Sequence, residues 1–157
     1  MAKTLGVQLK EKGSYILIIE LRDEIRVVFS RRVVELKPGY YAYVGSAGGL
    51  GGLKARLSRH CAKEKKVFWH IDKLTTSPSA TVLSAYYCVG VWGRVIEATL
   101  AKCLERELLP IPRFGSTDDR EATTHLFYAV DVERVKKVSL ECLERVCQSR
   151  IGIYNCH

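Results

Sequence analysis

The first third of the chain consists almost entirely of residues that favour β-strands. The segment Ser14–Arg22 is rich in Ile and Tyr, and Ile25–Leu36 continues with β-branched residues after a short polar turn. A second turn at Pro38–Gly39 leads into Tyr40–Gly45, which is heavy in Tyr and Val. Apolar runs bounded by turn residues predict β-strands. A sheet that starts from these residues is therefore the expected core.

The rest of the chain alternates helical and strand patterns. Residues 45–52 are mostly glycine, and after them Leu53, Leu57 and Cys61 recur at the four-residue spacing of one helix face. The predicted elements are a helix at Leu50–Lys63, a short helix at Val67–Leu74, a strand at Thr81–Val89, a helix at Arg94–Leu109, a polar loop at Arg113–Thr124, a strand at His125–Val130, a helix at Glu133–Ser149 and a tail or closing strand over the last eight residues. With 157 residues the chain fits one domain. The expected class is α+β, with a small central, mainly antiparallel sheet flanked by helices.

The composition is that of an ordinary globular protein, with 47% hydrophobic and 27% charged residues. No run approaches the roughly 18 apolar residues that a membrane helix needs, and no signal-peptide pattern opens the chain. We therefore expect a cytoplasmic protein that does not contact a membrane. The six cysteines include no CxxC pair, which argues against a zinc site. In a cytoplasmic protein, reduced and mostly structural thiols are expected; the oligomeric state stays open.

Much of the net charge of +8 is concentrated between residues 54 and 66, where six basic residues stand against the single acid Glu64. A patch of that density attracts a polyanion. The sequence therefore predicts a nucleic-acid contact, with a solvated cationic face as the alternative. The residues predicted to bind nucleic acid are Lys54, Arg59, Lys63, Lys65 and Lys66.

Two helices carry candidate chemistry. Arg56 and His60 are four residues apart and share a helix face, a geometry that suits a guanidinium holding a phosphate beside an imidazole that moves a proton. The alternative is a surface arginine and a boundary histidine. In the later helix, Glu97 projects into the apolar arc and needs a cation, because an unpaired carboxylate there costs several kcal/mol. A metal ion and a structural salt bridge both remain open for it.

Two half-motifs of tyrosine and glycine, with these helical residues behind them, carry a family resemblance. Gly13-Ser14-Tyr15 stands first, Tyr43-Val44-Gly45 stands second, and Arg56, His60 and Glu97 follow in order. Together they resemble the GIY-YIG nuclease superfamily. The first half-motif reads GSY, and the 27 residues between Tyr15 and Tyr43 imply an enlarged β segment (16–42) within a single domain over residues 1–157.

A narrower resemblance covers most of the chain. Its runs are Gly39–Gly45 with Ser46-Ala47, Leu53-x-x-Arg56-x-x-Arg59-His60, Trp69-His70-Ile71-Asp72, and Phe114-Gly115-Ser116 ahead of His125-Leu126-Phe127-Tyr128. These runs resemble an uncharacterised group, DUF123, known chiefly in archaea. Its members occur alone or joined to a DNA glycosylase of the endonuclease III type.

The resemblance implies a metal-dependent DNA endonuclease of DNA repair, with such a glycosylase as a partner. It implies that Glu97 holds one Mg²⁺ or Mn²⁺, that Arg56 binds the scissile phosphate, and that Tyr15 or Tyr43 orients or deprotonates the attacking water. His60 is the expected proton relay, and His70 is a further catalytic candidate. The alternative is a non-catalytic nucleic-acid-binding module, in which Glu97 pairs with a protein cation.

Overall fold

A six-stranded sheet forms the centre of the molecule. The computed structural model describes residues 9–29, 32–112, 114, 124–148 and 150–157, and most of the loop predicted at Arg113–Thr124 lies outside them. The strand order is β6–β7–β4–β1–β5–β8, and every neighbouring pair runs antiparallel. The strands are β1 (Gly13–Leu21), β4 (Gly39–Ala47), β5 (Ala80–Val89), β6 (Leu109–Pro110), β7 (Leu126–Ala129) and β8 (Ile151–Asn155). The predicted α+β class and mainly antiparallel sheet are confirmed.

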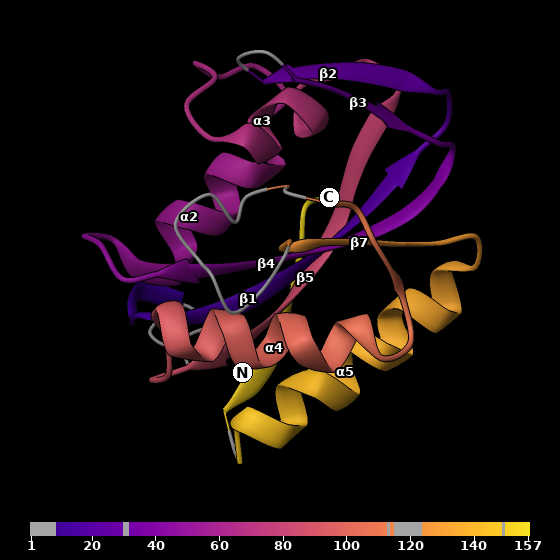
Figure 1. Cartoon of the computed structure of the whole chain (residues 1–157). Coiled ribbons are helices and arrows are strands. Elements are labelled where there is room, and N and C mark those ends of the chain that lie inside the picture. The colour runs from indigo at the N-terminus through magenta and orange to yellow at the C-terminus, as the bar shows by residue number, and fades with distance from the viewer. Residues whose placement is uncertain (1–8, 30–31, 113, 115–123, 149) are drawn as a thin grey trace.

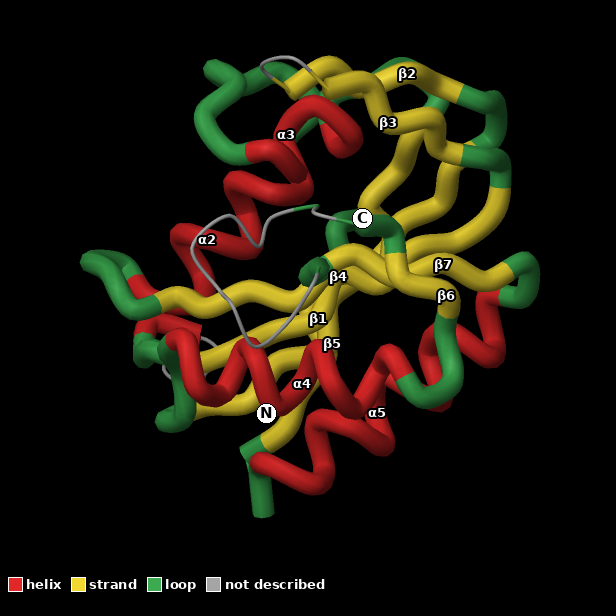
Figure 2. Tube along the Cα trace, viewed as in Figure 1, coloured by secondary structure: helices red, strands yellow, loops and turns green. Residues whose placement is uncertain are grey.

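Helices cover both faces of this sheet (Figure 1). One face carries α2 (Gly52–Cys61), α3 (His70–Thr75) and a separate two-stranded hairpin of β2 (Ile25–Phe29) and β3 (Arg32–Leu36). The other face carries α4 (Arg94–Glu105) and α5 (Val132–Val146), which cross below the sheet in the tube view (Figure 2). None of the helices in the described part of the chain is long and apolar enough to span a membrane.

Strand β1 is buried on both faces, which explains why its sequence is a continuous apolar run. Successive side chains of a strand point to opposite faces, so Tyr15 and Leu17 join the core under α2 and α3, whereas Ile16 and Ile18 join the core under α4 and α5. All four are at most 1% exposed. The domain therefore has two cores that share one central strand.

Several predicted boundaries shift for local physical reasons. The predicted segment Ile25–Leu36 is a hairpin, β2 and β3, that forms its own small sheet. Helix α4 ends at Glu105 because Leu109 and Pro110 pair with β7. Helix α3 begins at His70 and not at Val67, because the Asp72 carboxylate accepts hydrogen bonds from the backbone N–H groups of Phe68 and Trp69.

An ion pair joins α2 to the start of α3. Arg59 donates from both Nη atoms to the fully buried Asp72 carboxylate, each at 2.9 Å. Burial alone would raise the pKa of Asp72, but the hydrogen bonds from Arg59, Trp69 and Phe68 outweigh it and lower that pKa below its usual value. The carboxylate thus stabilises the folded state when it is charged.

We expect Asp72→Asn to lower the free energy of unfolding by about 2–4 kcal/mol at pH 7, less than for a wholly buried pair because Arg59 is partly exposed. Because the folded-state pKa is depressed, this contribution is present above the ordinary carboxyl pKa of about 4 and is lost as the pH falls through the folded value. Urea unfolding at pH 7 and pH 3 should show the difference between variant and wild type shrinking at low pH. An equal difference at both pH values would contradict this, and the exposed Glu64→Gln is the matched control.

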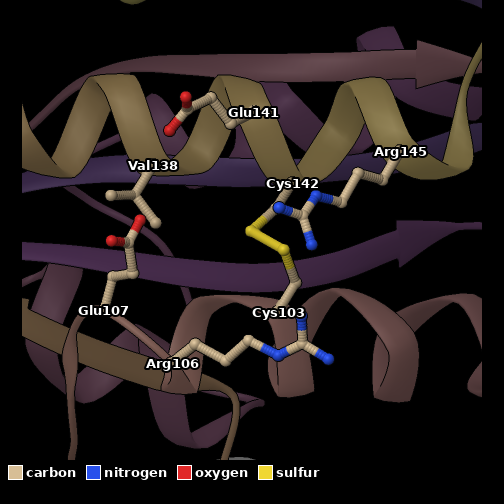
Figure 3. Close-up of a pocket in the computed structure, with 7 residues that line it drawn as sticks. All are labelled: Cys103, Arg106, Glu107, Val138, Glu141, Cys142 and Arg145. Atoms are coloured by element: carbon tan, nitrogen blue, oxygen red, sulfur yellow. A yellow bond between two sulfur atoms is a disulfide. The ribbon is translucent and has the colours of Figure 1, made fainter.

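All six cysteines are paired in the structure, which corrects the expectation of reduced thiols. The disulfides join Cys61 to Cys156, Cys88 to Cys147 and Cys103 to Cys142. Cys103–Cys142 bridges α4 and α5 at the wall of a small cavity that Arg106 and Arg145 also line (Figure 3). The partners are 39 to 95 residues apart in sequence, so no short-range spacing indicated them.

Alkylation and mass spectrometry of the unreduced, denatured protein should find no reactive thiol, and reduction should expose six. For loops of these lengths each disulfide contributes about 3–5 kcal/mol by restricting the unfolded chain. Reductant should therefore lower the thermal midpoint by many degrees. Alkylated cysteines in the unreduced sample would contradict the pairing.

Candidate functional site

The site begins with a buried hydrogen bond between β1 and α2. The Tyr15 hydroxyl lies 2.7 Å from His60 Nε2, and both residues are 1% exposed. Tyr15 faces Gly45 across the β1–β4 pair, and a Cβ atom on residue 45 would lie 2.4 Å from the phenol ring. The glycine of the second half-motif is thus required because the Tyr15 ring occupies the space of a side chain.

A third residue indicates the direction of this hydrogen bond. Arg56, one turn before His60 on α2, acts to lower the pKa of the Tyr15 phenol, and a guanidinium can only donate hydrogen bonds. We therefore expect the phenol oxygen to face Arg56 and the phenol O–H to donate to His60 Nε2. The His60 proton then sits on Nδ1, which has no hydrogen-bond partner among the described residues.

Burial keeps the Tyr15–His60 pair uncharged. The pKa of Tyr15 is raised, chiefly by burial and then by Tyr43, against the lowering effect of Arg56. The pKa of His60 is lowered to about 3 by burial and by the nearby cation of Lys65. At neutral pH the phenol therefore keeps its proton and the imidazole stays neutral.

Arg56 is held in place by an aromatic ring and a backbone carbonyl. Its guanidinium lies 4.3 Å from the centroid of Trp69, and the Arg59 guanidinium lies at the same distance. Arg56 Nη1 also donates to the carbonyl oxygen of Ser46 at 3.1 Å. Each cation–π contact contributes roughly 0.5–2 kcal/mol. These contacts fix the cation and leave further donors for a ligand, since a guanidinium carries five N–H groups.

The charge of Glu97 acts on the same cluster from the opposite layer. Its carboxylate lies 3.7 Å from Nδ1 of His125, whose carbonyl accepts a hydrogen bond from Val44 of β4. The pKa of the half-buried Tyr43 is raised by burial first and by the Glu97 charge next, and the same charge also raises the pKa of Tyr15. The carboxylate therefore lies within electrostatic reach of both phenols.

The structure thus brings together four of the residues predicted as site residues, namely Tyr15, Tyr43, Arg56 and His60, and places the charge of Glu97 within electrostatic reach of the two tyrosines. His70, the sixth, begins α3. The pKa of His70 is lowered by burial and by Lys73 on its own helix, rather than by a member of the cluster. His70 therefore has an environment separate from that of the cluster.

The basic residues predicted to bind nucleic acid divide into two kinds. Lys63 donates to the carbonyls of Thr75 and Ala80, and Lys65 donates to the carbonyls of Arg59 and His60. Lys65 therefore stabilises the C-terminal end of α2, as cations do at helix C-termini, whereas Lys63 joins the segment after α2 to the end of α3 and the start of β5. Lys54 and Lys66 are exposed to solvent and are the members that the fold presents outward.

Two parts of the site were not predicted in their observed roles. Trp69 was noted only as a neighbour of His70, yet its ring contacts both arginines of α2. His125 stands in one of the runs that resemble the narrower family, and the structure places its Nδ1 3.7 Å from the Glu97 carboxylate. The spacing of Arg56 and Arg59, three residues apart on one helix, is the signal that could have indicated a shared aromatic partner.

The fit of a divalent ion depends on a single carboxylate. Among the described residues, no group of three or more His, Cys, Asp or Glu is placed to hold a metal. The Glu97 side chain is 20% exposed, so one side of it faces solvent. Mg²⁺ usually keeps several waters and binds through one or two carboxylates together with substrate phosphates. Glu97 therefore fits the role of a single protein ligand.

Fold and site together define a single α+β domain with a buried Tyr–His–Arg cluster and a carboxylate that reaches it from across the sheet. The family model described as "Domain of unknown function DUF123" matches residues 14–148, from β1 to beyond the end of α5. The chain therefore belongs to the DUF123 family. No curated protein and no solved structure matches it.

The tautomer of His60 gives a direct test of the site. In ¹⁵N-edited NMR spectra, His60 should show an unprotonated Nε2 and a protonated Nδ1, with no titration between pH 8 and pH 5. An unperturbed histidine would titrate near pH 6.5. Tyr15→Phe keeps the ring and removes the donor, so the preference for this tautomer should weaken. A proton on Nε2 in the wild type would contradict the assigned hydrogen bond.

Proposed function

We propose that this domain is a metal-dependent phosphodiesterase that hydrolyses DNA. The observation that carries the proposal is the convergence of a held guanidinium (Arg56), a buried phenol–imidazole pair (Tyr15 and His60), a half-buried phenol (Tyr43) and a carboxylate (Glu97). These side chains come from separate parts of the chain, and a packing role alone does not require five ionisable groups near one place. The order of these residues also resembles that of the GIY-YIG nucleases.

In this proposal Arg56 binds the scissile phosphate and the charge that develops on it. A guanidinium matches phosphate oxygens with paired donors, and one held in a fixed position stabilises a transition state without reorganising. Trp69 and the Ser46 carbonyl fix its position. Lys54 and Lys66 add positive charge on the exposed face of α2 and after it.

Tyr43 is the phenol that contacts the attacking water. It is partly exposed, whereas Tyr15 is almost fully buried and hydrogen-bonded to His60. The water oxygen bonds to phosphorus, the bond from phosphorus to the leaving oxygen breaks, and the proton of the water leaves through the Tyr43 hydroxyl to solvent. Tyr15 and His60 act beneath it as positioning residues, because their hydrogen bond holds the phenol that Arg56 contacts.

Glu97 is the side chain that would hold one Mg²⁺ or Mn²⁺. When bound, such an ion stabilises the charge on the leaving oxygen. His125, 3.7 Å away, orients the carboxylate. The setting that we propose is DNA repair, beside a glycosylase of the endonuclease III type, since members of the resembling group occur joined to such an enzyme.

One observation favours a second candidate, a non-catalytic nucleic-acid-binding module. That function requires Glu97 to pair with a protein cation, and protonated His125 is close enough to serve. In this case the exposed lysines bind the backbone of the nucleic acid, and the cluster serves only to hold α2 on the sheet.

Nicking of supercoiled plasmid DNA separates the two candidates. With Mg²⁺ or Mn²⁺, wild type should nick and Glu97→Gln should be at least about 100-fold slower, the usual loss when a main charge-stabilising group is removed. Glu105→Gln, an exposed change on the same helix, is the matched control and should keep full activity. Nicking without metal that survives Glu97→Gln would overturn the proposal, and DNA binding without nicking would favour the second candidate.

A further inference from the structure

A groove of about 480 Å³ opens beside the candidate site. Its walls are the residues before β1, the glycine-rich turn after β4, the turn from β5 into α4, and the residue before β8. We call it the Trp92 groove, after its aromatic wall; Lys10, Lys12, Leu50 and Arg150 also line it. Its volume falls within the roughly 300–1,000 Å³ of small-ligand sites.

The Trp92 groove is aromatic on one wall and cationic on the other. The Trp92 side chain is 43% exposed and Leu50 is fully exposed. Lys10, Lys12 and Arg150 line the groove against one carboxylate, Glu11, which forms an ion pair with Arg150. An excess of positive charge therefore faces the groove next to an exposed indole.

Lys12 and Trp92 are already in contact. Lys12 Nζ lies 5.6 Å from the centroid of the Trp92 ring, a cation–π distance. The edge of the ring packs against Gly48, where a Cβ atom would lie 3.0 Å from Cδ1 and Nε1. The ring is thus fixed along one edge, while the flexible ammonium group on its face can exchange for a ligand.

The Trp92 groove connects directly to the candidate site. The backbone N–H of Gly93, next to Trp92, donates to the Ser46 hydroxyl at 2.9 Å, and the Ser46 carbonyl accepts from Arg56. Glu97 N donates to the Gly93 carbonyl, also at 2.9 Å. The segment that presents Trp92 is therefore bonded both to the strand that holds Arg56 and to the helix turn that carries Glu97.

We propose that the Trp92 groove binds one unpaired nucleotide, with its base stacked on Trp92 and its phosphate held by Lys10 and Lys12. A nucleotide carries a partner for both kinds of side chain in the groove. Every base has a π-face that can stack on the indole, and the phosphate accepts hydrogen bonds from the ammonium groups. A paired base inside a duplex cannot offer its face. The inference rests on the proposed function and extends it: the substrate is DNA with an unpaired nucleotide next to the scissile phosphate.

The test measures binding in EDTA, so it does not depend on catalysis. The probes are a duplex with a short single-stranded overhang and a blunt duplex of the same length. The chain has two tryptophans. Stacking of a base on Trp92 is therefore measured as the fluorescence quenching that wild type shows on binding and that Trp92→Phe does not show. Trp92→Ala should weaken overhang binding roughly 5- to 150-fold, the range for loss of one stacked base, and leave blunt-duplex binding unchanged.

Controls separate the groove from general effects. Val95→Ala removes another exposed apolar side chain nearby (78% exposed) and should leave both affinities unchanged. Should Trp92→Ala fail to fold, Lys12→Ala provides the same test, with selective loss for the overhang. Equal loss for both probes, unchanged overhang binding, or equal competition by polyglutamate would overturn the inference. The Glu97→Gln variant should keep the fluorescence quenching caused by the overhang probe. Failure of the proposed nuclease function and failure of the groove inference therefore give different results.

Discussion

The ring of Tyr15 lies over the backbone of Gly45, and this close approach sets the geometry of the whole site. It is possible because residue 45 has no Cβ atom. It leaves the phenol hydroxyl within hydrogen-bonding distance of His60 on α2 and close enough to Arg56 for that charge to act on it. Since β1 is buried on both faces between two cores, the strand that carries Tyr15 cannot shift without disrupting each of them.

Around this fixed phenol, the cluster separates its neutral groups from its charged ones. Tyr15 and His60 remain uncharged because burial disfavours their ionised forms. The Arg56 guanidinium packs against the face of Trp69, and Asp72 compensates the second arginine on that ring. As a result, Arg56 is a positive group whose position is determined by packing, and Glu97 is a negative group in the other layer whose charge acts on both phenols.

Local patterns in the sequence predicted much of this arrangement. The strands, the apolar face of α2 and the inward position of Glu97 follow from periodicity, which is a property of neighbouring residues. The pairing of Arg59 with Asp72 and the stacking of both arginines on Trp69 join segments 10 or more residues apart, and no periodicity specifies such contacts. The basic residues around α2 were predicted as one group, whereas backbone carbonyls engage two of them, Lys63 at the end of α3 and Lys65 at the end of α2.

The three disulfides are nested, since the link from Cys61 to Cys156 encloses the link from Cys88 to Cys147, which encloses the link from Cys103 to Cys142. No link crosses another, so the chain can oxidise from the innermost pair outward without threading one loop through another. Each closure shortens the path that the next pair must span, which lowers the entropic cost of the following step. Such an order of pairing needs no reshuffling of mismatched bonds to reach the native connectivity.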